Sequence, residues 1–319
     1  MRLIDWIMTL MAFLGIWIGA ILAVKPIDKI AKKFNSSSFI VSFFLLGILT
    51  SLTEVSVAFN SFIDNNVEIS VGNLLGGTLV LLLFVIPLLG VLVNGIKLNH
   101  GFGVTNVFLS IAYLLVPHIF LIDKKLSIGE SIVLAALYMF LAILLYIRNR
   151  IKLSTKVKQA SQKVSYLKVL TAFISLTFGS VILIFSSNVL VDNVDKIGAI
   201  FKLSPFVLAL LGLSLGTNLP EISLAIISAL KGKSEIGFGN YLGSALFNPF
   251  ILAVLGIFTG GITINANFII LLIFSTVGFL LFFVYIRSKN FLSRQESLLL
   301  LLIYIIFILT ELIRQFRYY

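Results

Sequence analysis

The fold follows from a stretch that occurs twice, as TSLTEVSVA at residues 50–58 and as TNLPEISLA at residues 217–225. Extended outward in the register that pairs Thr50 with Thr217, the alignment covers residues 46–81 and 213–248 without a gap, and 14 of its 36 positions are identical. Chance pairing of apolar residues does not explain these identities, so the chain contains an internal repeat. The polar and glycine identities include Thr50 with Thr217, Glu54 with Glu221, Ser56 with Ser223, Glu68 with Glu235, and Gly72-Asn73 with Gly239-Asn240.

The repeat lies in a chain of 319 residues that is too apolar to fold in water. Apolar residues make up 59% of it and charged residues 12%, and the mean hydropathy is +1.12. Nearly uncharged stretches of about 20 residues recur, which is the length that crosses a hydrocarbon core of ~30 Å. We therefore expect an all-α membrane protein with ten transmembrane helices. The predicted spans are 6–24, 39–62, 69–93, 102–122, 128–147, 167–190, 203–230, 236–258, 263–286 and 297–315.

The ten predicted spans divide into two units of five, and each copy of the repeat covers the second and third spans of its unit. Because five is odd, the second unit has the opposite orientation in the bilayer, an arrangement known from secondary transporters. The sequence thus predicts a first five-helix repeat at 1–147, a basic cytoplasmic linker at 148–166 and a second, inverted five-helix repeat at 167–319.

Basic residues are distributed unequally between the two predicted sides of the membrane. One side receives 17 of the 24 Lys and Arg residues, including the basic run at 148–168. The positive-inside rule makes that side cytoplasmic and places both termini outside. This topology accounts for the net charge of +11, so the expected partner is a lipid bilayer and not nucleic acid. The sequence does not specify an oligomeric state.

The chain offers little for enzymatic or redox chemistry. It contains no cysteine, which excludes disulfides and cysteine-ligated metal, haem or iron–sulfur centres. The predicted spans also lack a Ser/His pair, a histidine-based metal site and a pair of aspartates. We therefore expect neither an enzyme nor a resident cofactor.

Two acidic residues, Glu54 and Glu221, lie deep inside predicted spans and occupy equivalent positions in the two repeats. A charge at the bilayer centre costs roughly 2.5–3.5 kcal/mol on insertion scales. No Lys or Arg is predicted at the same depth, so a bound cation is the expected counter-charge of an ionised Glu. The structural alternative is a protonated Glu that hydrogen-bonds between helices.

Oxygen-bearing residues accompany both carboxylates. Thr50-Ser51 precede Glu54 by one helical turn, as Thr217-Asn218 precede Glu221, and residues three or four apart share a helix face. Pro220 has no N–H, so the helix must bend there and release backbone carbonyls. Carboxylate, hydroxyl and carbonyl oxygens suit hard cations such as Na⁺ and Ca²⁺.

The glycines and asparagines of the repeat have a simpler interpretation. They lie inside apolar spans without a Walker-type lysine, so we expect the glycines to permit close helix packing and not to bind phosphate. We expect the asparagines to cap or pack their helices. These residues are Gly72, Gly76, Gly77, Gly239 and Gly243, with Asn73 and Asn240.

The second copy reads GTNLPE at 216–221 and GNYLGSALFN at 239–248, and the first reads TSLTE at 50–54 and GNLLGG at 72–77. These motifs resemble the repeat signature of the cation/Ca²⁺ exchanger superfamily, and within it the prokaryotic Na⁺/Ca²⁺ exchangers. The resemblance implies a ten-helix antiporter of the prokaryotic inner membrane in which two central Glu residues bind Na⁺ and Ca²⁺ alternately. Carried over by position, it implies cation ligands at Thr50, Ser51, Glu54, Thr217, Asn218, Glu221, Ser244 and Asn248.

Four positions depart from that family pattern. Gly77 and Leu81 stand where the family usually has Ser and Asn, Thr53 stands where Pro is common, and Asn248 stands where many exchangers have Asp. The site would then hold at most two formal negative charges, which is enough to neutralise one Ca²⁺. Fewer ligands remain for several Na⁺ ions.

Three functions are compatible with these observations. The leading hypothesis is a Na⁺/Ca²⁺ antiporter that works by alternating access. The second is an antiporter of H⁺ and a divalent cation, although the Gly-Asn segments lack the Glu that is typical of proton-coupled relatives. The third is a non-transporting scaffold or sensor with a degenerate site.

Overall fold

The computed structural model describes residues 3–33, 36–97, 103–156, 166–201, 203–266, 268–289 and 291–317. Within these residues, ten helical segments are long and apolar enough to cross a membrane, which confirms the predicted number of spans. The protein is therefore an integral, multi-pass membrane protein. The segments are Leu10–Ala31, Ser38–Ile63, Val67–Leu92, Val104–Asp123, Ile128–Arg148, Tyr166–Ser186, Pro205–Leu230, Glu235–Phe258, Ile269–Arg287 and Arg294–Gln315.

Several spans are built from more than one helical element, because their backbone changes hydrogen-bonding pattern or breaks. The first repeat contains α1 (Leu3–Val24), α2 (Ile27–Lys33), α3 (Ser38–Val41), η1 (Ser42–Leu46), α4 (Gly47–Thr50), α5 (Leu52–Ile63), α6 (Val67–Val80), η2 (Leu81–Val85), α7 (Ile86–Leu92), β1 (Ile96–Lys97), α8 (Val104–Phe120), η3 (Leu121–Asp123), β2 (Lys125–Leu126) and α9 (Ile128–Lys156). The second contains α10 (Tyr166–Phe201), α11 (Pro205–Val207), η4 (Leu208–Leu213), α12 (Ser214–Thr217), α13 (Leu219–Leu230), α14 (Ser234–Phe258), β3 (Ile262–Thr263), α15 (Ile269–Lys289), β4 (Phe291–Leu292) and α16 (Arg294–Arg317).

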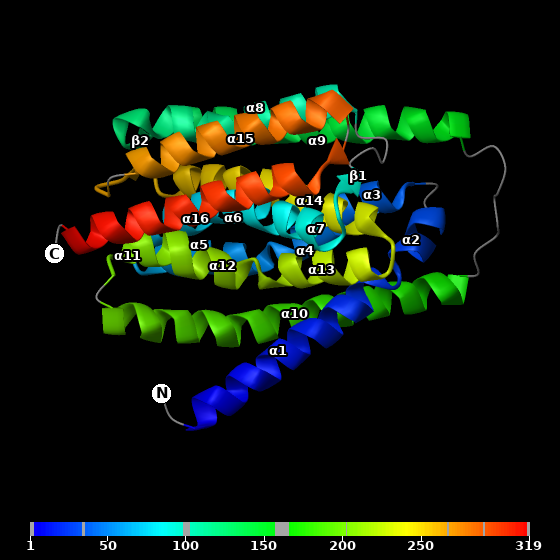
Figure 1. Cartoon of the computed structure of the whole chain (residues 1–319), viewed down its shortest axis with the longest axis horizontal. Coiled ribbons are helices and arrows are strands. Elements are labelled where there is room, and N and C mark those ends of the chain that lie inside the picture. Colours follow the sequence, from blue (N-terminus) through cyan, green and yellow to red (C-terminus); the bar gives the residue numbers. More distant parts are fainter. Residues whose placement is uncertain are drawn as a thin grey trace.

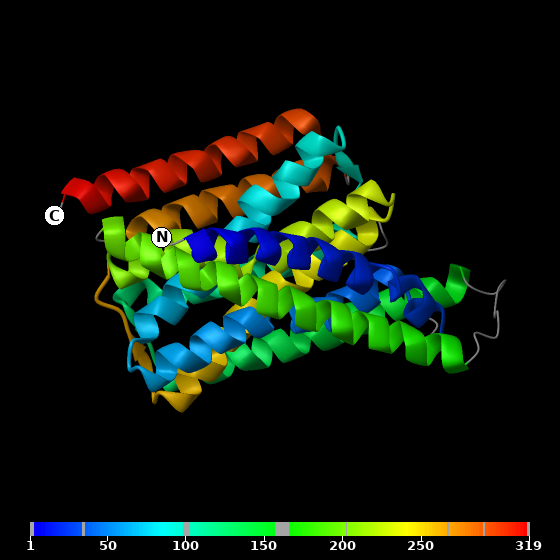
Figure 2. The same ribbon diagram turned by 90° about the horizontal axis from the view of Figure 1, so that it is seen from below.

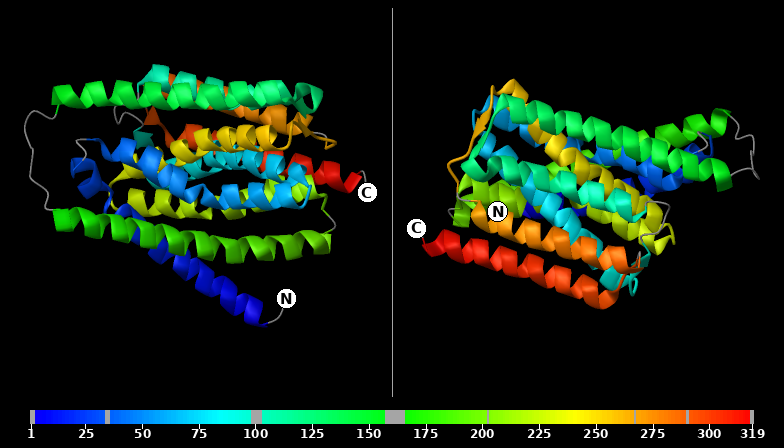
Figure 3. Two further views of the ribbon diagram at one scale, coloured as in Figure 1. Left: turned by 180° about the vertical axis from the view of Figure 1, so that it is seen from behind. Right: turned by 90° about the horizontal axis from the view of Figure 1, so that it is seen from above.

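The second, third, seventh and eighth spans form the centre of the bundle. Between 56% and 83% of their residues are buried, against 28–50% in the other six spans. α1 and α10 lie along one side of this centre, and α8, α9 and α15 lie along the opposite side (Figure 1). The view from behind also places α9 and α10 on opposite sides (Figure 3). The outer helices expose large apolar side chains, as lipid contact requires.

α1 and α10 cross closely on the periphery (Figure 2). The helices touch at Gly19 and Gly179, where a Cβ built on either glycine would lie 2.8 Å from the other's carbonyl oxygen. Ser175 adds a hydrogen bond of 3.0 Å to the carbonyl of Leu22. This small-residue contact is typical of helix packing in membranes.

Equivalent glycines hold the two repeats together at the centre. A Cβ on Gly76 of α6 would lie 2.5 Å from the carbonyl oxygen of Leu210 in η4. The repeat-related Gly243 of α14 approaches the carbonyl of Phe43 in η1 in the same way. The prediction that these glycines permit close packing is confirmed, and the packing is between repeats: each third-span helix lies against the broken helix of the other unit.

Two short antiparallel ribbons connect the repeats, one at each end of the helix bundle (Figure 1). β1 pairs with β4 and β2 pairs with β3, so each repeat contributes one strand to each ribbon. Continued in the same register, the repeat alignment carries Ile96 of β1 onto Thr263 of β3, and Lys125 of β2 onto Leu292 of β4. The chain begins and ends at the end of the bundle where β2 lies (Figure 1). Both termini therefore share one side, as the even number of spans predicted.

Several predicted boundaries differ from the structure. The ninth span begins at Ile269 and not at 263, because Ile262–Thr263 form β3. α9 continues to Lys156, past the predicted end at 147, and α10 continues to Phe201, past the predicted end at 190. α9 extends through a polar, basic stretch, and α10 extends through a mixed stretch in which Asp192, Asn193, Asp195 and Lys196 interrupt the apolar residues. Residues 157–165 of the predicted linker at 148–166 lie outside the described residues.

Candidate cation site

Both predicted site helices are broken at the repeat-related positions Ser51 and Asn218. Ser51 has φ −71° and ψ 2°, and Asn218 has φ −87° and ψ 7°, so the helix ends and restarts at each residue. Pro220 explains the second break, as predicted, because it lies in the first turn of α13 and cannot donate to the preceding turn. The first break forms without a proline, since Thr53 stands at that position.

The carboxyl groups of Glu54 and Glu221 lie just after these breaks and are completely buried. They are close enough to interact electrostatically with each other. In the described part of the chain, neither carboxyl group forms an ion pair with Lys or Arg. By contrast, Glu311 in α16 is bound 2.6 Å from Arg314. An ionised Glu54 or Glu221 would thus need a different counter-charge.

Ser244 of α14 connects Glu221 to the first repeat. Its hydroxyl lies 2.9 Å from Glu221 Oε1, 3.2 Å from the Thr50 hydroxyl and 3.1 Å from the carbonyl oxygen of Gly47. Thr50 also donates to Asn240 Oδ1 at 3.3 Å and interacts with Glu221. Carboxylate, hydroxyl, amide and carbonyl oxygens therefore gather in this half of the site.

The other half is centred on Thr53, whose hydroxyl lies 2.7 Å from Glu54 Oε2. The same hydroxyl lies 3.0 Å from the Thr50 carbonyl oxygen and 3.1 Å from the Thr217 carbonyl oxygen, so it contacts both helix breaks. The Thr217 hydroxyl interacts with Glu54 and donates to Asn73 Oδ1 at 3.1 Å.

Asn218 and Asn248 meet around Gly77 of α6. Asn218 Nδ2 donates to the carbonyl of Ser214 at 2.7 Å, and Asn248 Nδ2 donates to the carbonyl of Leu74 at 3.4 Å. A Cβ on Gly77 would lie 2.8 Å from Asn218 Nδ2 and 3.0 Å from Asn248 Nδ2. The two amide nitrogens occupy this space and donate to backbone carbonyls. The two amide oxygens take no part in these hydrogen bonds.

Four buried oxygens at this centre have no hydrogen-bond partner among the described residues: Glu54 Oε1, Glu221 Oε2, Asn218 Oδ1 and Asn248 Oδ1. Buried polar atoms are normally satisfied, so four unpartnered acceptors in one region call for a ligand that supplies positive charge or donors. No group of three or more His, Cys, Asp or Glu side chains forms a metal site within the described ranges. The donor set is thus two carboxylates with neutral oxygens, which fits a hard cation.

The structure brings most of the predicted site residues together by direct contacts. Ser51 is connected indirectly, because its hydroxyl bonds to the Gly47 carbonyl, 2.8 Å away, which Ser244 also contacts. Sequence reasoning missed the roles of Thr53, Asn73 and Asn240, which hydrogen-bond across the repeats or to a carboxylate. The identity of Asn73 and Asn240 between the copies was the available signal. The side chains of this centre are 0–1% exposed, so the site is closed to both ends of the bundle.

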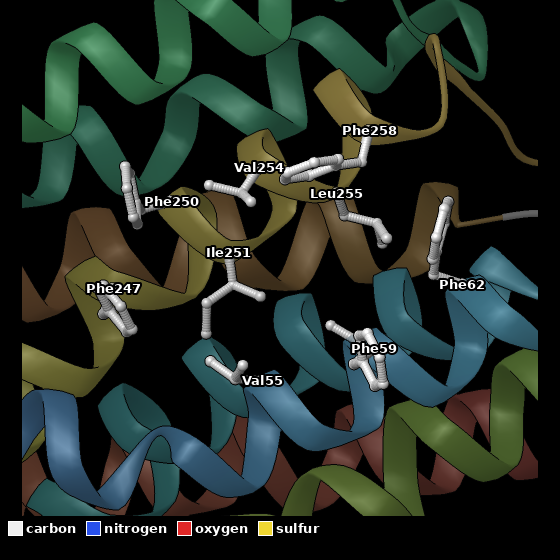
Figure 4. A pocket seen from close by; sticks show the side chains of 10 residues that line it. Val55, Phe59, Phe62, Phe247, Phe250, Ile251, Val254, Leu255 and Phe258 are labelled. Carbon is white, nitrogen blue, oxygen red and sulfur yellow. The ribbon is translucent and has the colours of Figure 1, made fainter.

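An apolar cavity of about 330 Å³ lies beside the site, between α5 and α14 (Figure 4). Val55 follows Glu54 and Phe247 precedes Asn248, so the cavity adjoins the polar centre without including it. Its lining has no charged side chain and is unsuited to an ion. The lining residues are Val55, Ala58, Phe59, Phe62, Phe247, Phe250, Ile251, Val254, Leu255 and Phe258.

Comparison with known proteins places this arrangement in a family. The sequence profile described as "Sodium/calcium exchanger protein" matches residues 4–147 and 171–312, one segment in each repeat. The chain belongs to the sodium/calcium exchanger protein family. The two matched segments agree with the two five-helix units, and the family assignment points to a membrane transporter.

Relatives of this exchanger-family protein cover much of its length. The inner membrane protein YrbG of Escherichia coli is 25% identical over 257 residues, which is 75% of this chain and 77% of that protein. An uncharacterized membrane protein of Methanocaldococcus jannaschii is 23% identical over 298 residues, which is 93% of this chain and 94% of that protein. Human sodium/potassium/calcium exchanger 3 is 31% identical over 121 residues, but these are only 37% of this chain and 19% of that protein.

The fold is also that of a solved exchanger. The structure of the sodium-calcium exchanger NCX_Mj soaked with Na⁺ and Sr²⁺ superposes with a TM-score of 0.79 at 19% identity, and covers 96% of this chain and 98% of that one. This similarity confirms the predicted fold of ten helices in two repeats.

Proposed function

We propose that this exchanger-family protein is a secondary active antiporter that exchanges Na⁺ for Ca²⁺ at the site between Glu54 and Glu221. The observation that carries this proposal is the group of four buried oxygens without partners among the described residues, which belong to both carboxyl groups and to Asn218 and Asn248. A cation that binds them satisfies all four at once. The ions are transported substrates, and no resident cofactor is required.

Charge explains the coupling between the ions. Two ionised carboxylates neutralise one Ca²⁺, and their negative charge equally attracts Na⁺. Ca²⁺ and Na⁺ therefore compete for Glu54 and Glu221 and cannot both have the full set of oxygens. Each ion leaves when the other type occupies the site, so exchange follows from mutual exclusion.

The closed site fits the occluded step of an alternating-access cycle. The site residues are 0–1% exposed, so an ion bound there would have no contact with either solution. Opening to one side must break hydrogen bonds that cross between the repeats, such as those of Thr50 with Asn240 and Thr217 with Asn73. Because the repeats are inverted, the equivalent bonds control opening to opposite sides.

The orientation and location follow from charge and family. The β1–β4 end carries Lys97, and the linker at 148–166 adds six more basic residues, so we assign this end to the cytoplasm and both termini to the outside. The membrane is the inner membrane of a prokaryotic cell, and the bilayer is the surrounding partner.

The test is Ca²⁺ uptake into proteoliposomes under an imposed Na⁺ gradient, under a pH gradient and without a gradient. We expect uptake that is driven by Na⁺ and lost in the Glu221→Gln variant. Uptake driven only by the pH gradient would instead establish exchange of H⁺ for a divalent cation. Binding of Ca²⁺ without flux under any gradient would favour the scaffold or sensor hypothesis and overturn transport.

A further inference from the structure

The two halves of the site differ at two repeat-related pairs. The repeat alignment pairs Gly77 with Ser244 and Thr53 with Pro220. At these two positions the second repeat has a hydroxyl on its third-span helix and none at the proline, whereas the first repeat has the reverse. One hydroxyl is present in each half, but at a different place in the chain.

The displaced hydroxyl makes the equivalent contact. Ser244 lies 2.9 Å from Glu221 Oε1, and Thr53 lies 2.7 Å from Glu54 Oε2. In each case the second carboxylate oxygen, Glu221 Oε2 or Glu54 Oε1, has no partner among the described residues. Each Glu thus has one oxygen held by a hydroxyl and one oxygen unoccupied. The two carboxyl groups therefore have the same hydrogen-bonding arrangement, although the hydroxyl comes from α14 for Glu221 and from α5 for Glu54.

The surroundings of Gly77 explain why the hydroxyl of the first repeat is at residue 53 and not at residue 77. In the half of the site around Glu221, Ser244 and Ser51 both bond to the Gly47 carbonyl, at 3.1 and 2.8 Å. The matching carbonyl in the other half is that of Ser214, which is bonded by Asn218 at 2.7 Å. The longer Asn218 side chain fills the place of a side chain at residue 77, where a Cβ would lie 2.8 Å from Asn218 Nδ2. A serine at residue 77 would require the amide of Asn218 to shift, because that amide already takes the space.

We propose that Thr53 is the positioning residue for Glu54, and that it replaces a hydroxyl at residue 77, where the Asn218 side chain takes the space. The inference rests on the proposed function, because it describes how one carboxylate is held for the transported cation. A hydroxyl has a single proton, so Thr53 donates to one of Glu54, Thr50 and Thr217 at a time. When the proton goes to Glu54 Oε2, the nearest acceptor at 2.7 Å, Thr53 orients that carboxylate, and the two helix-break carbonyls are the competing acceptors.

The first test compares Thr53→Ala, Thr53→Val and Thr53→Ser with the unmodified protein in the Ca²⁺-uptake assay. Loss of a hydrogen bond to a charged group should raise the KM for Ca²⁺ roughly tenfold in the Ala and Val variants. Thr53→Ser keeps the hydroxyl and should stay within about threefold. The control is Ser275→Ala, because the buried Ser275 hydroxyl donates to carbonyls of its own helix, α15. It should leave KM unchanged.

The second test moves the hydroxyl to residue 77. The combined Gly77→Ser and Asn218→Ser variant copies the Ser244 and Ser51 pair that the chain already accommodates. In this background a second donor is available to Glu54, so Thr53→Ala should raise KM by less than about threefold, against roughly tenfold in the unmodified protein. Because each effect is measured within one background, the direct effect of changing Asn218 cancels.

Several outcomes would overturn the inference. One is an unchanged KM in both Thr53→Ala and Thr53→Val. Another is a loss of folded protein without a change in KM, which would make Thr53 merely structural. An equal effect of Thr53→Ala on KM in the unmodified protein and in the Gly77→Ser and Asn218→Ser variant would also refute the inference, because a hydroxyl at residue 77 would then not substitute for that of Thr53.

Thermal stability separates this inference from the proposed function. If the unmodified protein shows no Ca²⁺ flux, the transport proposal fails, and the Ca²⁺-induced rise in Tm becomes the readout for Thr53. That rise should be smaller in Thr53→Ala and intact in Thr53→Ser and Ser275→Ala. No Ca²⁺-induced rise in the unmodified protein would refute the role of Thr53 as well.

Discussion

The Thr217 hydroxyl donates a hydrogen bond of 3.1 Å to Oδ1 of Asn73, although the two residues belong to different repeats. The inverted counterpart joins Thr50 to Asn240 at 3.3 Å, where the Leu46 carbonyl, 3.0 Å from the Thr50 hydroxyl, is a competing acceptor. Each bond connects a helix break of one repeat to the third-span helix of the other. In the proposed transport cycle this contact rearranges when the site opens, so the two bonds would couple the proposed ion site to the interface between the repeats.

We therefore predict that Asn73→Ala and Asn240→Ala both slow transport. Each variant removes the acceptor of a threonine that also faces a carboxylate, and the loss of one buried hydrogen bond corresponds to roughly a tenfold change. Initial rates of Ca²⁺ uptake measure the effect. Asn60→Ala is the matched control, because Asn60 is exposed at the end of α5. A defect in one variant but not in the other would contradict the equivalence of the two bonds.

We predict that Ca²⁺ and Na⁺ stabilise the protein through Glu54 and Glu221. A ligand that binds the folded state at 100 times its Kd adds about 2.7 kcal/mol of stability, which appears as a higher Tm. Thermal unfolding with and without each ion should show this rise in the unmodified protein and not in Glu54→Gln or Glu221→Gln. Glu311→Gln is the matched control, since Glu311 is also buried in a span but is paired with Arg314. An equal Tm rise in all four proteins would place the cation elsewhere.

The sequence predicted the membrane spans, which depend on apolar length, and the two inverted halves, which depend on the internal repeat. Apolar length sets the spans, and the repeat of Thr50–Ala58 as Thr217–Ala225 predicted the inverted halves. The helix break at Asn218 was also foreseen, because Pro220 cannot continue the backbone pattern. The ends of α9 and α10 were not foreseen, since polar residues interrupt the apolar signal while the helix continues.

The site was predicted only in part, because a repeat alignment pairs equivalent residues and not contacting ones. It matches Thr50 with Thr217, whereas Thr50 contacts Ser244 and Asn240. The relation of Gly77 to Asn218 was likewise hidden, since they lie in different repeats and meet only when α6 packs against α12. Gly77 therefore looked like a lost ligand, although its space is filled by another side chain.

We predict that the central glycines do not tolerate alanine. A methyl group on Gly76 or on Gly239 would lie 2.5 Å from a backbone carbonyl oxygen of the other repeat, and backbone cannot move aside cheaply. Each Ala variant should lose about 1–3 kcal/mol of stability and show a lower Tm. Gly129→Ala is the control, since the nearest atom to an added Cβ there is 4.0 Å away. Unchanged Tm values for Gly76→Ala and Gly239→Ala would show that the repeats are not packed this closely.

The assignment of the two sides can be tested by labelling single cysteines, because the natural chain contains no cysteine and needs no prior removal. Lys125 lies in β2 and Lys231 follows α13, and both side chains are exposed. The fifth, sixth and seventh spans separate the two positions, so they should face opposite solutions. In intact cells, a membrane-impermeant maleimide should label Lys125→Cys and should label Lys231→Cys only after the membrane is opened. The reverse pattern would mean that the excess of basic residues faces outward, contrary to the positive-inside rule.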